Sequence, residues 1–198
     1  MTDENHSKTK SALIGPFDSL RDYMAAIEDL GQVMHVSGLD QDSYEATGFM
    51  YRLIDKLGWA EAPAVVFKNI KINGQWQDGP IIANQYGRWE SEGLAFGVDP
   101  SGDEQYITYQ NVLSKLADLA TKDKQWKEVQ PNEVERKTAP CKEVVIKEHD
   151  INMLDFPFLQ TNPGDAGPYI NTGSVILEDP NLGRNVGTYR CQITGPRK

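Results

Sequence analysis

The chain has 198 residues, of which 39% are hydrophobic, so it is long enough to bury a core. Its 29 acidic residues outnumber 20 basic ones and give a net charge of −9, which disfavours nucleic acid and anionic membranes as partners. The first ten residues lack the apolar stretch of a signal peptide, and no segment approaches the roughly 20 apolar residues of a membrane span. We therefore expect a soluble, cytoplasmic protein.

The first half of the chain alternates helical and extended patterns. Residues 1–15 are polar and predict a disordered leader, and residues 16–120 predict an α/β subdomain. Its expected helices cover residues 20–30, 46–57, 89–96 and 109–119, and its expected strands cover residues 33–36, 64–67 and 80–83. Asn73-Gly74 predicts a tight turn, and we expect the apolar stripe of the last helix to pack in the core; it comprises Val112, Leu113, Leu116 and Leu119.

The second half has a β-rich pattern. Residues 121–140 are charged and predict an exposed connection, and residues 141–198 predict a second domain. We expect extended segments at 143–147 and 150–156, a stiff loop at 157–167, and a hairpin of residues 169–177 and 185–194. The fold class is therefore α+β. Cys141 and Cys191 form no C-x-x-C pair, so neither a disulfide framework nor a thiolate zinc site is expected, and Cys191 fits a small core position.

The second strand of the expected hairpin is unusually polar, since it carries Asn185, Thr188, Tyr189 and Arg190. In a structural interpretation, Asn185 ends the turn through its own side-chain hydrogen bonds, and Arg190 either snorkels, with its charged end in solvent, or pairs with a surface carboxylate. In a functional one, Asn185 is a neutral ligand of a hard cation and Arg190 a fixed cation that holds a carboxylate. The residues alone leave both open. The odd spacing of Asn185 and Arg190 places them on opposite faces of a regular strand, so a shared site predicts a bulge at residues 186–188, which Gly187 would permit.

Other catalytic patterns are absent from the sequence. There is no phosphate-binding G-x-x-x-x-G-K-[ST] loop, no G-x-G-x-x-G motif that opens a helix, and no nucleophile elbow. The three histidines, His6, His35 and His149, lack the H-x-x-x-H spacing of a metal site. The hairpin is therefore the candidate site.

Several segments together resemble the UbiD-type decarboxylases, in the order usual for that family and from about Asp18 to the last residue. The specific ones are Pro163 to Gly173, the Asp179-Pro180 turn and Asn185 to Arg190; the weaker ones are Ser19 to Tyr23, Gly31 to Val33, Ala62 to Ile70 and Cys141 to Val145. The resemblance implies reversible, non-oxidative decarboxylation of an aromatic or α,β-unsaturated acid. It further implies that residues 141–198 begin a split β-barrel flavin-binding domain, in a protein that is usually a homo-oligomer.

The resemblance also implies a cofactor and roles for the hairpin residues. The cofactor would be prenylated FMN with a divalent metal, manganese or magnesium, and often potassium. Asn185 would bind the metal, Thr188, Tyr189 and Arg190 would line the flavin, and Arg190 would also be catalytic, together with glutamates. An arginine suits this role because it stays charged and can hold a carboxylate in a defined pose.

The main departure from the family is length, because family members have several hundred residues. We expect the chain to be an N-terminal part that is inactive alone, completed by further C-terminal polypeptide or a partner subunit. Intact mass of the purified protein would test this expectation. Two alternatives stay open: a non-catalytic flavin-binding, regulatory or assembly subunit, favoured by the lack of an obvious glutamate–arginine–glutamate set, and a flavin reductase-like barrel that uses FMN and NAD(P)H.

Overall fold

The structure is a computed structural model that describes residues 14–100, 105–120 and 130–198. Most of the expected leader, His6 and half of the expected connection lie outside these residues. The chain divides into two compact units. The first combines the residues up to Ser37 with Phe49–Lys68 and Pro80–Val129, and the second combines Gly38–Gly48, Asn69–Gly79 and Gln130–Lys198.

The first two expected helices are confirmed, and local residues at their ends explain their bounds. Helix α1 spans Leu20–Asp29, and the Ser19 hydroxyl caps it by accepting a hydrogen bond from the Asp22 amide. Helix α2 spans Glu45–Leu57. Gly31 and Gly58 follow the two helices with φ angles of +71° and +84°, the left-handed conformation that glycine tolerates best.

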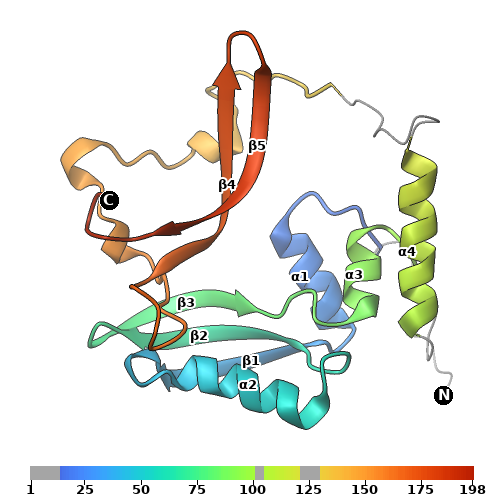
Figure 1. Cartoon of the computed structure of the whole chain (residues 1–198), viewed down its shortest axis with the longest axis horizontal. Helices are drawn as coiled ribbons and strands as arrows, with labels where there is room; N and C mark the ends of the chain where they lie inside the picture. Colours follow the sequence, from blue (N-terminus) through green and yellow to red (C-terminus); the bar gives the residue numbers. More distant parts are fainter. Residues whose placement is uncertain (1–13, 101–104, 121–129) are drawn as a thin grey trace, which may run out of the picture. The chain divides into compact units, whose positions relative to one another are not determined.

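Three strands form one sheet in the order β1-β2-β3, and all are longer than expected. They span Val33–Asp40, Ala64–Ile72 and Gln75–Ala83, and each contributes residues to both compact units. The turn between β2 and β3 is confirmed at Asn73 and Gly74, whose φ angles of +52° and +74° match the tight hairpin turn typical of Asn-Gly. Helix α2 runs along this sheet (Figure 1), where the rings of Phe49 and Phe67 meet edge to face at 6.2 Å.

The core of the first unit lies where α1, β2 and α3 (Trp89–Ala95) meet. Tyr23, Ile27, Ala64 and Leu94 form it, and none is more than 4% exposed. The Tyr23 hydroxyl donates to the Gln85 carbonyl at 2.5 Å, and burial raises the pKa of this phenol. The expected helix at 89–96 is thus confirmed, and its Leu94 is a central core residue.

Helix α4, Gln105–Leu119, packs against α3 but buries a narrower stripe than expected. Thr108 and Val112 are 1% and 5% exposed, whereas Leu113 and Leu119 are 43% and 48% exposed. Residues four apart share one helical face, so the packed face follows Thr108, Val112 and Leu116, with Leu113 and Leu119 beside it. The expectation that all four apolar residues pack in the core is therefore wrong.

Residues 141–156 contain no strand, contrary to the expected extended segments at 143–147 and 150–156. It forms short 3₁₀ helices at Pro140–Lys142, Glu148–Asp150 and Met153–Asp155. Val144, Val145 and Ile146 are at least half exposed and pair with no strand among the described residues. A short apolar run predicts a strand only if a partner is available, and this run has none there.

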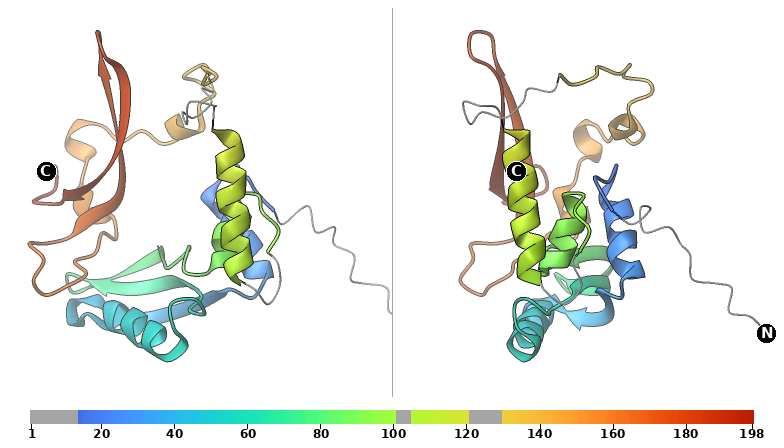
Figure 2. Two further views of the ribbon diagram at one scale, coloured as in Figure 1. Left: turned by 45° about the vertical axis from the view of Figure 1, so that its right-hand side comes forward. Right: turned by 90° about the vertical axis from the view of Figure 1, so that its right-hand side faces the viewer.

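The expected C-terminal hairpin is confirmed as an antiparallel pair, β4 (Tyr169–Asp179) and β5 (Gly183–Gln192). Both appear as one long two-stranded ribbon (Figures 1 and 2). Asp179 Oδ1 closes the turn by accepting bonds of 2.8 Å from the Asn181 and Leu182 amides, and Gly183 completes it with φ of +80°. The fold is thus α+β. Within the described residues, no helix has the length and apolar content to cross a membrane.

Candidate functional site

The four expected site residues all lie on β5, and all are exposed. Their partners on β4 follow from the register: Leu177 lies opposite Asn185, Ser174 opposite Thr188, and Gly173 opposite Tyr189. The hairpin therefore presents these side chains on a two-stranded ladder, in which each strand pairs its backbone along one edge only.

The register decides which of these side chains share a face. It is unbroken from the Asp179–Gly183 pair to the Gly173–Tyr189 pair. Because side chains alternate along a regular strand, Asn185 and Tyr189 lie on one face and Thr188 and Arg190 on the other. The structure therefore does not bring Asn185 and Arg190 together on one face of the hairpin.

The expected bulge at residues 186–188 is wrong, and the irregularity of the hairpin lies in β4. Ile170 pairs with Cys191 and Gly173 with Tyr189, so Asn171 and Thr172 together oppose the single residue Arg190. Gly187 has another role. A Cβ atom there would lie 2.4 Å from the Tyr189 ring, so the glycine makes room for the ring rather than for a bulge.

The side chain of Arg190 lies over an aromatic ring that the sequence did not single out as part of the site. Its guanidinium carbon is 5.7 Å from the centroid of the Tyr169 ring, within cation–π range. No ion pair of Arg190 occurs among the described residues. The surface pairing of the structural interpretation is therefore not seen there, and the guanidinium keeps donors for an anion. The register places Tyr169 diagonal to Arg190, and the sequence alone carries no signal of this contact.

The loop before β4 is tied to the base of the hairpin, the end that carries Arg190. The Leu159 carbonyl accepts from the Tyr169 amide at 3.3 Å, and the Pro168 carbonyl accepts from the Ile193 amide at 2.9 Å. The Ala166 carbonyl accepts from Gln192 Nε2 at 3.0 Å. The expected stiff loop at 157–167 thus contacts both strands at the base of the hairpin, the end opposite the turn.

The cysteines and histidines form no second site in the part of the chain that the structure describes. Both cysteines are free; Cys141 is exposed, and Cys191 is half-buried rather than a core residue. His35 Nε2 lies 2.5 Å from Glu28 Oε1, and His149 lies 3.4 Å from Asp150. Within the described ranges, no three His, Cys, Asp or Glu side chains are grouped to hold a metal.

The donor set on the hairpin fits a phosphate-bearing cofactor only in part. Arg190 and Thr188, on one face, offer a cation and a hydroxyl, which suit a carboxylate or a phosphate. Asn185 offers one neutral oxygen to a metal, whereas hard divalent cations take six or more oxygen ligands including carboxylates. Further ligands would have to come from groups outside this cluster.

Comparison with known proteins shows which proteins the segment that contains this hairpin is similar to. Residues 132–198 match the family model UbiD, described as the 3-octaprenyl-4-hydroxybenzoate carboxy-lyase Rift-related domain. A phenolic acid decarboxylase of Sedimentibacter hydroxybenzoicus is 31% identical over 185 residues, which are 89% of this chain and 35% of that protein. The chain thus spans about a third of its curated relative.

Solved structures of other proteins are similar in fold to nearly the whole of this chain. The open form of the vanillic acid decarboxylase of Sedimentibacter hydroxybenzoicus matches with a TM-score of 0.68 and 30% identity, covering 91% of this chain and 35% of that one. The UbiD-class enzyme HmfF of Pelotomaculum thermopropionicum, in an evolved dimeric form in complex with prFMN, matches with a TM-score of 0.65 and 26% identity, covering 91% and 37%. These matches show that the chain is similar to UbiD-class decarboxylases and spans about one third of their length.

Proposed function

We propose that the chain provides part of a decarboxylase that removes carbon dioxide, reversibly and without oxidation, from an aromatic or α,β-unsaturated carboxylic acid. The observation that carries this proposal is the exposed Arg190, which is held over Tyr169 at the base of the hairpin in a segment that matches the UbiD model. A guanidinium with free donors is the group best suited to hold a substrate carboxylate in a fixed pose.

Within this proposal, the two faces of β5 have different tasks. Arg190 and Thr188 bind and orient an anionic group on one face. On the other face, Asn185 would supply one oxygen to a divalent metal, manganese or magnesium, and Tyr189 would help to line the flavin. We propose that the remaining ligands and the acid–base groups come from further polypeptide of the same protein or from a partner subunit, and that the assembly is a homo-oligomer.

Prenylated FMN would supply the electron sink that decarboxylation at an sp² carbon requires. Two structures of HmfF, one in complex with prFMN and one with FMN, support a flavin at this fold. The chain's own contribution is electrostatic and positional. The permanent charge of Arg190 compensates the substrate carboxylate before reaction, and the rigid hairpin fixes where that charge lies.

The direct test is a decarboxylation assay on protein purified from cells that prenylate FMN, with a panel of aromatic and α,β-unsaturated acids and detection of released carbon dioxide. The chain is assayed by itself and together with the remaining polypeptide of its protein. Turnover in the completed protein supports the proposal. Bound flavin without turnover would favour a non-catalytic flavin-binding or assembly subunit, and oxidation of NAD(P)H with ordinary FMN would favour a flavin reductase.

A further inference from the structure

The most deeply buried glutamine of the second unit lies far in sequence from the hairpin. Gln41 is 4% exposed and begins the 3₁₀ helix Gln41–Ser43 that follows β1. Its Nε2 donates to Thr47 Oγ1 at 3.0 Å and to the Gln160 carbonyl at 2.9 Å, while its Oε1 accepts from the Thr47 amide at 3.3 Å. A buried amide is costly unless it is hydrogen-bonded, and both ends of this one are.

Thr47 makes a second bond to the same loop. Its hydroxyl donates to the Thr161 carbonyl at 2.9 Å and accepts from Gln41. The left-handed backbone of Tyr44, with φ of 58°, ends the 3₁₀ helix and lets α2 begin at once, which brings residues 41 and 47 side by side. Two neighbouring side chains therefore hold two consecutive loop carbonyls, those of Gln160 and Thr161.

The loop that they hold is closed by its own bonds. Gln160 Nε2 donates to the carbonyls of Asn162 and Asp165 at 3.2 and 3.0 Å. Asp165 Oδ2 accepts from the Asn162 amide at 3.0 Å and from the Thr161 hydroxyl at 3.1 Å. These internal bonds and the prolines at 157, 163 and 168 restrict the conformations of the loop. A shift at its anchor should therefore displace the loop as a rigid segment.

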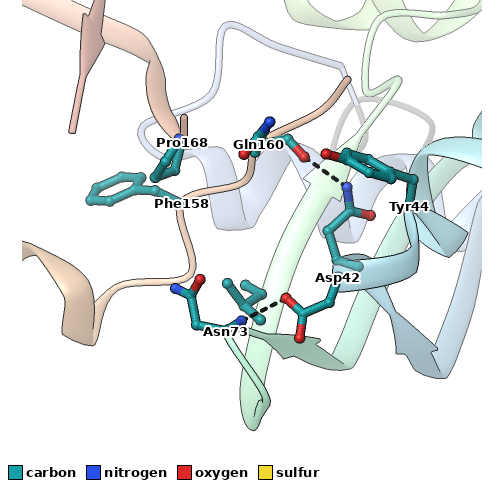
Figure 3. Close-up of a pocket in the computed structure, with 8 residues that line it drawn as sticks. Asp42, Tyr44, Asn73, Phe158, Gln160 and Pro168 are labelled. Atoms are coloured by element: carbon teal, nitrogen blue, oxygen red, sulfur yellow. Dashed lines mark hydrogen bonds between the residues drawn. The ribbon is translucent and has the colours of Figure 1, made fainter. Parts of the chain in front are cut away.

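A cavity of about 160 Å³ lies beside this anchor, and Figure 3 shows Gln160 facing the segment that carries Asp42 and Tyr44. Two of its polar side chains, Gln41 and Asp42, are already hydrogen-bonded. The two carboxylate oxygens of Asp42 accept from the amides of Asn73 and Gly74, both at 2.7 Å, and Gln41 is fully bonded. Gln41 bonds the loop at the Gln160 carbonyl, so we interpret the cavity as a gap within this anchor.

The anchored loop is hydrogen-bonded to the part of the hairpin where Arg190 lies. Leu159, Ala166 and Pro168 bind the hairpin base at Tyr169, Gln192 and Ile193, and the Tyr169 ring lies under the Arg190 guanidinium. We propose that Gln41 and Thr47 are positioning residues for Arg190: they hold the 157–168 loop, and through it they set where the guanidinium lies. The proposal rests on the proposed function for its catalytic consequence, although not for its geometry.

The test compares Thr47→Val, which removes the hydroxyl but keeps the shape, with Thr47→Ser, which restores the hydroxyl. Thr138→Val is the matched control, because the Thr138 hydroxyl also donates to a carbonyl, that of Glu135 at 3.1 Å, away from the loop. The first readout is amide hydrogen exchange at Tyr169 and Ile193, which we expect to rise roughly tenfold in Thr47→Val, since about one net hydrogen bond is lost. The second is the NMR resonance of Arg190 Nε, which the Tyr169 ring shifts.

We expect the Arg190 resonance to move in Thr47→Val and to return in Thr47→Ser, with no change in Thr138→Val. In the completed decarboxylase, kcat should fall several-fold in Thr47→Val with KM less affected, and the serine variant should recover it. An unchanged Arg190 resonance with faster exchange would overturn the proposal, because the anchor would then be merely structural. If Thr47→Val does not fold, Gln41→Met takes its place with the same readouts.

The design separates this proposal from the proposed function. If the wild-type protein shows no decarboxylation with any acid, the proposed function fails, while hydrogen exchange and the Arg190 resonance still decide the positioning claim. If the wild type turns over and the resonance moves but kcat does not, the catalytic part of the positioning claim is wrong.

Discussion

Apolar side chains are buried in the core around Ile27 but exposed on the β4–β5 hairpin. Ile27 is fully buried between α1, β2 and α3, whereas Ile176 and Val186, which face each other across the hairpin, are 65% and 60% exposed. The core is stabilised by burial of apolar surface, and the hairpin by its backbone ladder and by the loop tied to its base. Substitutions should therefore affect stability in the first region and chemistry in the second.

The largest effect should come from Arg190. Arg190→Ala removes the charge proposed to hold the substrate carboxylate, so decarboxylation by the completed enzyme should fall by about 100-fold or more, while the fold is kept because the side chain is exposed. Steady-state kinetics and circular dichroism measure the two outcomes. The control is Arg184→Ala on the same strand, whose guanidinium lies 3.8 Å from Glu178. Wild-type turnover in Arg190→Ala would refute the assigned role.

A pair of identical substitutions tests the contrast in stability. Ile27→Ala leaves a cavity in the core and should lower the free energy of unfolding by about 2–5 kcal/mol. Ile176→Ala, on the exposed hairpin, should change it by less than about 0.5 kcal/mol. Urea unfolding followed by fluorescence measures both. A large loss in Ile176→Ala would mean that the hairpin is covered in the assembled protein, and the contrast would not hold.

The contrast also explains which predictions from the sequence succeed. Apolar spacing predicts α1, α2 and α3 well, because these helices bury a stripe within the chain; Gly31, Gly58 and Gly97 follow them with left-handed φ angles. The Asn73-Gly74 turn and the β4–β5 hairpin follow from local turn chemistry. The extended segment expected at residues 143–147 is wrong, because no local signal in the sequence indicates whether a strand has a partner.

The sequence predicts the residues of the candidate site on β5, but not the register or the contacts that position them. Residue types and motif order place Asn185, Thr188, Tyr189 and Arg190 on one strand, but the sequence gives no register, so the bulge was expected beside Gly187 and lies instead opposite Arg190. Tyr169, Gln41 and Thr47 were missed because their contacts join segments far apart in the chain. Such contacts depend on tertiary structure and leave no periodic pattern.

Substitution of Asn185 should have a moderate effect, which is a loss of cofactor retention. Asn185→Leu removes the amide oxygen proposed as a metal ligand, so protein purified with flavin and manganese should lose metal and then flavin on dialysis faster than the wild type. Elemental analysis and flavin absorbance measure the loss. Asn181→Leu, in the turn of the hairpin, is the control and should retain both. Full metal and flavin in dialysed Asn185→Leu would rule out the ligand assignment.

The smallest effect should come from the turn. The amides of Leu182 and Asn181 hold the pKa of the Asp179 carboxyl below its usual range. A lowered folded pKa means that this bonding stabilises the turn above the ordinary aspartate pKa and is lost as the pH falls through the folded value. The Leu182 amide shift should therefore titrate with a midpoint below that of a free aspartate. In Asp179→Asn this titration should vanish, and an unchanged curve would assign it to another group.

The most direct measurement of the central claim, a prenylated-FMN site built on this hairpin, is the absorbance spectrum and mass of the compound that co-purifies from cells able to prenylate FMN. The account predicts a bound flavin with the mass of prenylated FMN, in wild-type amount in Arg184→Ala and in reduced amount in Asn185→Leu. Purified protein, complete with its remaining polypeptide, that binds no flavin, or that binds only ordinary FMN when the prenylated form is present, would contradict it.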